Sequence, residues 1–335
     1  EEIAKSIQAF DLEVAPLLRV KVLRVSEEKH ILVSDMHHII SDGTSLSILI
    51  EEFVSLYTDQ ELPKLKIQYK DFAVWQKGRK KSDEMKEAEN FWLKELDFGD
   101  ENIPVLDLPT DYKRPGIRRN AGDTYYYTLS EDVAKGIKEL ALDMNASLFM
   151  VLLELFSITL SKYSNQEEMI IGTVTAGRTH GELENLIGVF LNNLALRCTP
   201  SNNLSAMEYL VRLKDKVLKA YDNQQYPIEE LIDLLNLPFD LGRKALFDVM
   251  VIYQNFEEAK VDLTEEEFTV KSYTTGKKTS DYDITLYVNK VDEQIKFCFE
   301  YSTILFKAET IQRMARHIEN IAKQIISEPD MKIKN

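Results

Sequence analysis

The chain has 335 residues, of which 41 are basic and 56 are acidic, so its formal net charge is −15 at pH 7. A surplus of acidic groups repels the phosphate backbone and argues against nucleic acid as a partner. Hydrophobic residues make up 44% of the chain, which is typical of a globular enzyme long enough for two domains.

Membrane, disulfide and metal signals are missing from the sequence. No apolar run reaches the ~18–20 residues that span a bilayer, and the first residues do not form a signal sequence. Cys198 and Cys298 lie in strand-like apolar segments without CxxC or metal-ligand spacing. We therefore expect a cytoplasmic protein with reduced thiols, no membrane contact and no metal. Residues 1–9 are typical of the end of a helix, so we expect an opening segment before Glu1.

Both strands and helices are predicted in the first third of the chain. Strands are expected at 16–25 and 30–38, and helices at 69–80 and 82–96. Between them, apolar residues recur at helical spacing, which predicts one apolar helix face. These residues are Leu46, Leu49, Ile50, Phe53, Val54 and Tyr57.

Glycine and proline interrupt the pattern over 97–122, which indicates a linker. The expected organisation is an N-terminal lobe of residues 1–98, a linker of 99–122 and a C-terminal lobe of 123–335. The second lobe restarts with a strand at 124–129, and Ser130 begins a helix. Further helices are expected at 147–163, 204–221, 227–235 and 307–326, and strands at 168–175, 187–198, 247–253, 268–273, 282–288 and 295–301. Both lobes mix helices with sheet, which predicts two α/β lobes with a cleft between them.

The run Met36-His37-His38-Ile39-Ile40-Ser41-Asp42-Gly43 places two of the five histidines where a strand turns into a helix. Ser41 or Asp42 is a suitable N-cap, and Gly43 allows a sharp turn. Strand alternation places His37 on the same face as Asp35 and His38 on the other face. Only one histidine can then face a given cleft, and a hydrogen bond between His37 and the Asp35 carboxylate is expected.

Six segments in this order resemble the condensation domain of nonribosomal peptide synthetases, in the chloramphenicol-acetyltransferase-like acyltransferase group. The first is the histidine turn, which matches a His-His-x-x-x-Asp-Gly signature. The resemblance covers nearly the whole chain. The other five segments are Tyr69-Lys70-Asp71-Phe72-Ala73-Val74-Trp75, Ile187-Gly188-Val189-Phe190-Leu191-Asn192-Asn193, Asn223-Gln224-Gln225-Tyr226-Pro227-Ile228-Glu229, Arg243-Lys244-Ala245-Leu246-Phe247-Asp248-Val249-Met250 and Tyr301-Ser302-Thr303-Ile304-Leu305-Phe306.

The resemblance implies a mixed α/β fold of two lobes in a V with a central tunnel. It implies that His38 faces the tunnel as the base or positioning group for peptide-bond formation, and that Asp42 holds the turn. The amide of Gly43 could steady an oxyanion. Asn192 or Asn193 could line the tunnel or have a purely structural role. The family's arginine-bearing segment that braces Asp42 is expected before Glu1.

The resemblance also implies the partners and the source of the cofactor. Phosphopantetheine is expected on upstream and downstream peptidyl carrier domains, beside an adenylation domain, with the chain monomeric within a larger synthetase. The chain itself has no P-loop, dinucleotide fingerprint or GxSxG nucleophile, so no covalently bound cofactor is expected. Three alternatives stay open: an epimerisation domain, a coenzyme A dependent acyltransferase, and a docking platform for carrier proteins without catalysis.

Overall fold

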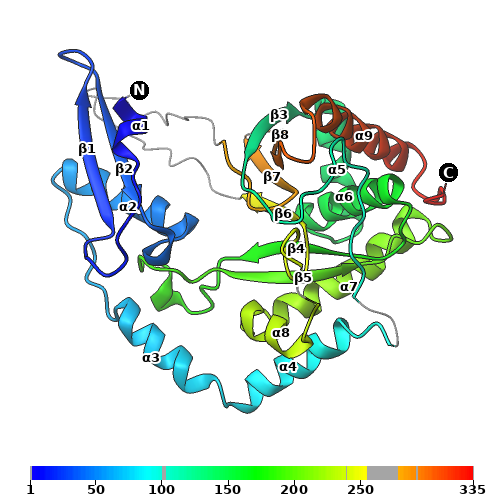
Figure 1. Ribbon diagram of the computed structural model, residues 1–335, viewed down its shortest axis with the longest axis horizontal. Coiled ribbons are helices and arrows are strands. Elements are labelled where there is room, and N and C mark those ends of the chain that lie inside the picture. The colour runs from blue at the N-terminus through cyan, green and yellow to red at the C-terminus, as the bar shows by residue number, and fades with distance from the viewer. Residues whose placement is uncertain (1, 100–102, 239, 255–277, 292, 335) are drawn as a thin grey trace. The chain divides into compact units, whose positions relative to one another are not determined.

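The computed structural model describes residues 2–99, 103–238, 240–254, 278–291 and 293–334 (Figure 1). These residues form two compact units. The first contains residues 2–80 and 176–191, and the second begins at Lys81 and contains the remaining described residues. The division differs from the one expected from the sequence, because the helix at 83–95 belongs to the second unit. Its buried side chains Met85, Ala88 and Trp92 are part of the main core of that unit.

The first unit carries a two-stranded antiparallel sheet, in which register runs from Leu18↔Met36 to Arg24↔His30. Its elements are α1 (Glu2–Ser6), β1 (Leu18–Arg24), β2 (His30–Met36), the 3₁₀ helix η1 (His38–Ile40), α2 (Gly43–Tyr57), α3 (Tyr69–Arg79) and the 3₁₀ helix η2 (Gly181–Leu183). Helix α2 forms where the apolar spacing predicts it. However, its buried residues are Ser45 and Ile48, and Phe53 and Tyr57 of the expected apolar face are exposed.

The second unit is built on a six-stranded mixed sheet with the order β3-β8-β7-β6-β4-β5. Strand β6 pairs in parallel with β4 and β7, and the other neighbours are antiparallel. The strands are β3 (Gly122–Thr128), β4 (Met169–Thr175), β5 (Asn192–Cys198), β6 (Val249–Gln254), β7 (Ile284–Val291) and β8 (Gln294–Ser302). The helices are α4 (Asp83–Glu95), α5 (Glu131–Asp143), α6 (Leu148–Ser164), α7 (Ala206–Asp222), α8 (Ile228–Leu235) and α9 (Ala308–Ser327).

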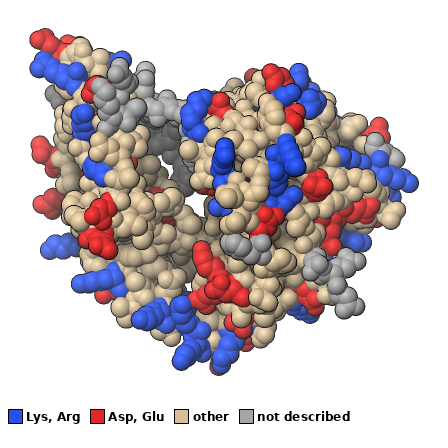
Figure 2. Space-filling view, in the orientation of Figure 1, with Lys and Arg blue, Asp and Glu red and all other residues tan. Residues whose placement is uncertain are grey.

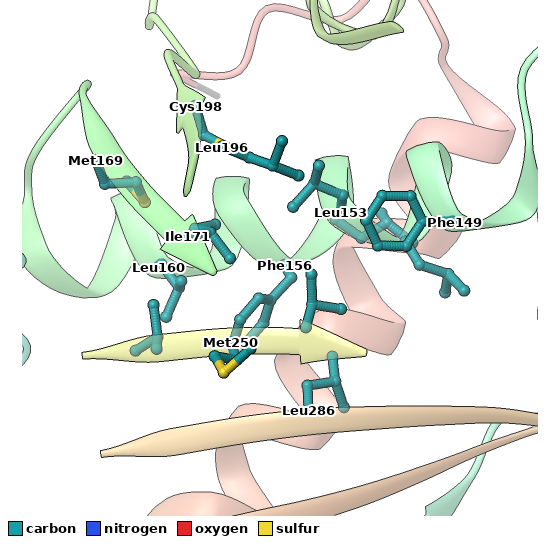
Figure 3. Packing of buried hydrophobic residues seen from close by; sticks show 14 of the residues in the cluster. Phe149, Leu153, Phe156, Leu160, Met169, Ile171, Leu196, Cys198, Met250 and Leu286 are labelled. Carbon is teal, nitrogen blue, oxygen red and sulfur yellow. The ribbon is translucent and has the colours of Figure 1, made fainter. Parts of the chain in front are cut away.

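Helix α6 is the centre of the core of the second unit. The Ser147 hydroxyl accepts a hydrogen bond from the Met150 amide at 3.3 Å and caps the helix, and Asn165, with φ 55°, ends it. Every residue from 149 to 161 is buried, as expected of a helix that is mostly apolar around its circumference. Figure 3 shows its side chains clustered with those of Ile171, Met250 and Leu286 from the sheet.

Most elements of the second unit are confirmed, with two exceptions. The strand expected at 187–198 begins only at Asn192, because residues 176–191 leave the sheet and belong to the first unit. The strand expected at 268–273 lies outside the described residues. The mixed α/β fold class is confirmed.

The visible surface carries both signs of charge. Figure 2 shows Lys and Arg side chains interspersed with Asp and Glu, with uncharged surface between them.

In the part of the chain that is described, no single helix has the length and apolar character to cross a bilayer. Helices α5 and α6 together reach that length and apolar character, with a bend of 113° between them. Most of α6 is core, which accounts for its composition.

Glu154 lies in the middle of α6 with 1% of its surface exposed. Neither carboxylate oxygen has a hydrogen-bond partner among the described residues. Burial raises the pKa of Glu154 well above its ordinary value, so it favours the neutral acid in the folded protein. The unfolded chain ionises it above pH ~4.3. The residue therefore lowers the free energy of unfolding as the pH rises, by about 1.4 kcal/mol per pH unit until the folded pKa is reached.

We predict that Glu154→Gln removes this penalty, because glutamine has nearly the same shape and does not titrate. Urea denaturation at pH 5 and pH 8 measures the effect. The free energy of unfolding of the variant, relative to that of the native protein, should be higher at pH 8 than at pH 5. An equal difference at both pH values would contradict a neutral Glu154 in the folded state.

Candidate active site

The histidine turn joins β2 to α2 through two consecutive caps. The Nδ1 atom of His37 accepts a hydrogen bond from the Ile39 amide at 3.1 Å and caps the short η1 helix. After the extended Ser41, the Oδ1 atom of Asp42 accepts from the Ser45 amide at 2.8 Å and caps α2. Asp42 is a preferred N-cap residue because its carboxylate satisfies an amide that the helix leaves unpaired. Gly43 is the first residue of α2 and is exposed.

Strand alternation does not separate the two histidines. Strand β2 ends at Met36, so both lie in the turn and not in the strand. The expected bond between His37 and Asp35 is wrong for the same reason. The Asp35 carboxylate instead accepts from Arg19 Nη1 at 3.2 Å, and the His37 ring meets the Phe10 ring edge-on at 6.0 Å.

His38 begins the η1 helix and is exposed. Within the described parts of the chain, no group forms a hydrogen bond with its imidazole, and only its backbone carbonyl accepts a bond, from the Ser41 amide at 3.3 Å. Among the described residues, both ring nitrogens of His38 thus lack a hydrogen-bond partner. The turn thus presents one histidine with a free ring beside one whose ring is used as a cap.

The carboxylate of Asp42 is almost completely buried and is surrounded by donors. Arg178 donates from Nη1 to Oδ2 at 2.8 Å and from Nη2 to Oδ1 at 3.0 Å. The Phe190 amide donates to Oδ2 at 3.1 Å, and the Ser45 hydroxyl lies 2.8 Å from Oδ1. Side-chain exposure is 5% for Arg178 and 3% for Asp42. A bidentate, fully hydrogen-bonded geometry is what a buried ion pair requires.

Two opposing effects set the pKa of Asp42. Burial alone raises it, but the hydrogen bonds from Arg178, from the Ser45 and Phe190 amides and from the Ser45 hydroxyl outweigh burial and lower the pKa. Since the folded pKa lies below that of the unfolded chain, the charged form contributes stability at pH values above ~3.9. That contribution is lost as the pH falls through the lowered folded pKa.

Arg178 is the functional-site residue that sequence reasoning missed: it braces Asp42 within this chain, whereas the resemblance placed an arginine-bearing brace before Glu1. Arg178 lies three residues after the end of β4 and follows Gly177, which has a φ of +64°. A Cβ atom at Gly177 would lie 1.8 Å from the Phe190 carbonyl oxygen, so only glycine fits there. The signal in the sequence was the pair Gly177-Arg178 at the end of a buried strand.

Residues 176–191 are held to the first unit by side chains from α2 and α3. The Ser45 hydroxyl contacts both backbone groups of Gly188, and the Tyr69 hydroxyl donates to the Val189 carbonyl at 2.9 Å. A small hydrophobic cluster supports these bonds and consists of Phe72, Leu183, Leu186 and Phe190, with Ile67 and Tyr69 packed against it. The backbone of 188–190 thus bonds to side chains, which explains why the expected strand does not begin at 187.

Asn192 and Asn193 open strand β5 in the second unit. The Asn192 amide donates to the carbonyls of Gln224 and Tyr226 at 2.8 and 2.6 Å, and its oxygen accepts from the Ile228 amide at 3.4 Å. Asn192 therefore fastens the segment between α7 and α8 to the sheet, which is a structural role. Asn193 pairs with Val174 in the sheet, and its tunnel-lining role stays a prediction.

The chain matches a family model described as the condensation domain over residues 1–335. It is 42% identical to tyrocidine synthase 3 of Brevibacillus parabrevis over 97% of this chain and 5% of that protein. It is 40% identical to gramicidin S synthase 2 of Aneurinibacillus migulanus over 99% of this chain and 7% of that protein. The chain thus spans less than a tenth of the length of these relatives.

Solved structures share the fold at lower identity. A four-domain nonribosomal peptide synthetase bound to AMP and glycine superposes with a TM-score of 0.86 at 20% identity, over 98% of this chain and 26% of that one. The X-domain from teicoplanin biosynthesis gives a TM-score of 0.86 at 22% identity, over 98% of this chain and 76% of that one. These likenesses establish the fold.

We predict that Arg178→Lys lowers the free energy of unfolding by about 2–4 kcal/mol, because lysine keeps the charge but cannot form the bidentate pair. Arg19→Lys is the control in the same unit. Its ion pair with Asp35 is more exposed, since the side chains of Arg19 and Asp35 are 38% and 15% exposed. The loss of unfolding free energy should therefore be about 1 kcal/mol or less. Urea denaturation compares the two. Equal losses would contradict a special role for the buried pair.

Proposed function

This chain belongs to the condensation-domain family, and we propose that it forms peptide bonds in nonribosomal peptide synthesis. The amine of an acceptor aminoacyl thioester attacks the carbonyl of a donor peptidyl or aminoacyl thioester. The new C–N bond forms as the C–S bond breaks, and the donor thiol leaves. The observation that carries the proposal is the exposed imidazole of His38, which has no hydrogen-bond partner among the described residues and lies on a turn held by the buried pair of Asp42 and Arg178.

His38 acts on the attacking amine, as a base or by positioning it. Histidine is the side chain that changes charge nearest to neutral pH, so it can accept the proton that the amine loses when the C–N bond forms. An α-amino group has a pKa of ~7.7–8.0 and is already partly neutral in this range. Bringing two tethered substrates together is worth ~7–11 kcal/mol. Positioning therefore supplies much of the rate, and a base supplies the rest.

Gly43 and Asp42 have supporting roles in this proposal. Gly43 is the first residue of α2, where helix amides have no partner within the helix and the helix dipole is positive. Its amide stabilises the oxyanion of the tetrahedral intermediate. Asp42 acts through the geometry of the turn, because its oxygens already accept hydrogen bonds from protein donors.

The partners in this proposal are an upstream and a downstream peptidyl carrier domain and an adjacent adenylation domain. Each carrier domain brings its substrate on a phosphopantetheine arm as a thioester. The relatives named above are synthases of which this chain matches only a small part, which supports a place within a larger synthetase.

We predict that His38→Ala lowers the rate of dipeptide formation about 100-fold or more, as expected for loss of a positioned acid–base group. The protein is incubated with donor-loaded and acceptor-loaded carrier proteins, and the dipeptidyl thioester is quantified by mass spectrometry. His30→Ala is the matched control, because His30 is exposed at the start of β2, and it should retain the native rate.

The same assay separates the alternatives. Full activity of His38→Ala would contradict the assignment. Inversion of the tethered residue without a dipeptide would indicate an epimerisation domain. Acyl transfer from free acyl coenzyme A would indicate a coenzyme A dependent acyltransferase. Binding of loaded carriers without any product would indicate a docking platform.

A further inference from the structure

Ser45 makes four polar contacts through a single hydroxyl oxygen near the histidine turn. It lies in the first turn of α2 and is completely buried. Its hydroxyl lies 2.8 Å from Asp42 Oδ1 and 3.0 Å from Arg178 Nη2. The same oxygen lies 2.8 Å from the Gly188 carbonyl oxygen and 3.0 Å from the Gly188 amide nitrogen. One small side chain therefore joins the buried ion pair to the backbone of the 176–191 segment.

The Ser45 hydroxyl uses all of its hydrogen-bonding capacity within the protein. A serine hydroxyl has one proton and two lone pairs. Arg178 and the Gly188 amide occupy the two lone pairs, and the proton is shared between the Asp42 carboxylate and the Gly188 carbonyl. No capacity remains for substrate. Loss of the hydroxyl would leave the buried amide of Gly188 without this partner, which is expensive in a dry environment.

We propose that Ser45 is a positioning residue for the reaction at the histidine turn, an inference that rests on the proposed function. The hydroxyl fixes the distance between the first turn of α2 and the Gly188 backbone. Asp42, three residues earlier, is fixed by the same oxygen and by Phe190, and η1 with His38 precedes Asp42 directly. Displacement of α2 from residues 186–190 therefore displaces His38.

Serine suits this task better than the ion pair alone. Its side chain has a single torsion that sets the oxygen position, so the link between α2 and Gly188 is short and stiff. The ion pair joins Asp42 to Arg178, whereas the Ser45 hydroxyl also joins the first turn of α2 directly to the Gly188 backbone. Glycine is also needed at position 188, because a Cβ atom there would lie 2.1 Å from the Tyr69 ring.

Ser157 provides a matched control in the second unit. It is also completely buried, and its hydroxyl bonds to the Glu154 carbonyl at 2.9 Å and to the Tyr209 hydroxyl at 2.8 Å. Ser157→Ala thus makes the same chemical change at the same burial without touching the histidine turn. A loss of stability alone should affect both variants alike.

The test compares Ser45→Ala and Ser157→Ala in dipeptide formation with loaded carrier proteins, at a temperature where both are folded. We expect Ser45→Ala to lower kcat by about 10-fold to 100-fold with KM for the acceptor carrier unchanged, and Ser157→Ala to keep the native kcat. In a His38→Ala background, Ser45→Ala should cost little further activity, because both changes act on one group. A merely structural role would lower the activity in either background.

The outcomes are distinct. Equal kcat for the two alanine variants, with an active native protein, overturns the role of Ser45 and leaves the proposed function intact. A native protein that forms no dipeptide overturns the proposed function and the role of Ser45 together. If Ser45→Ala does not fold, Ser45→Cys is compared with Ser157→Cys, because the thiol nearly preserves volume but is a weak hydrogen-bonding group. Equal kcat for this pair overturns the role of Ser45 as well.

Discussion

The buried carboxylate of Asp42 is the group on which the candidate site depends. Removing a charge from water costs several kcal/mol, and only a full set of good donors offsets that cost. The chain supplies these donors from the first turn of α2, from Arg178 after β4, and from the Phe190 amide. Burying one charge therefore brings together segments more than a hundred residues apart in sequence, and it fixes the turn that carries His38.

This constraint also explains the path of the chain between β4 and β5. The two strands pair directly in the sheet of the second unit, from Met169↔Cys198 to Thr175↔Asn192. A short hairpin would connect them with a few residues. Residues 176–191 instead belong to the first unit, where Gly177 and Gly188 permit close backbone approaches and where Arg178 and Phe190 serve Asp42. The segment that braces the histidine turn thus follows β4 and precedes β5 in the sequence.

Much of the fold could be predicted from local patterns, whereas the brace could not. The strongly apolar run at α6 and the capping Asp42 gave correct elements because each signal is local in sequence. Arg178 lies 136 residues from Asp42, and no local pattern pairs one arginine with one aspartate. The alternation argument for His37 and His38 failed because β2 ends one residue before the pair. The boundary expected near residue 98 differs from the start of the second unit at Lys81, because the apolar face of α4 is buried in the core of that unit.

The central claim is that the Asp42 network is one cooperative unit joining α2 to residues 186–190. Native-state hydrogen exchange of the Ser45, Gly188 and Phe190 amides tests it most directly, because these donate to Asp42 or to the Ser45 hydroxyl. The account predicts that all three exchange with one opening free energy, and that Asp42→Asn lowers it equally for Gly188 and Phe190. Rapid exchange of Gly188 and Phe190 beside a protected Ser45 amide would contradict it.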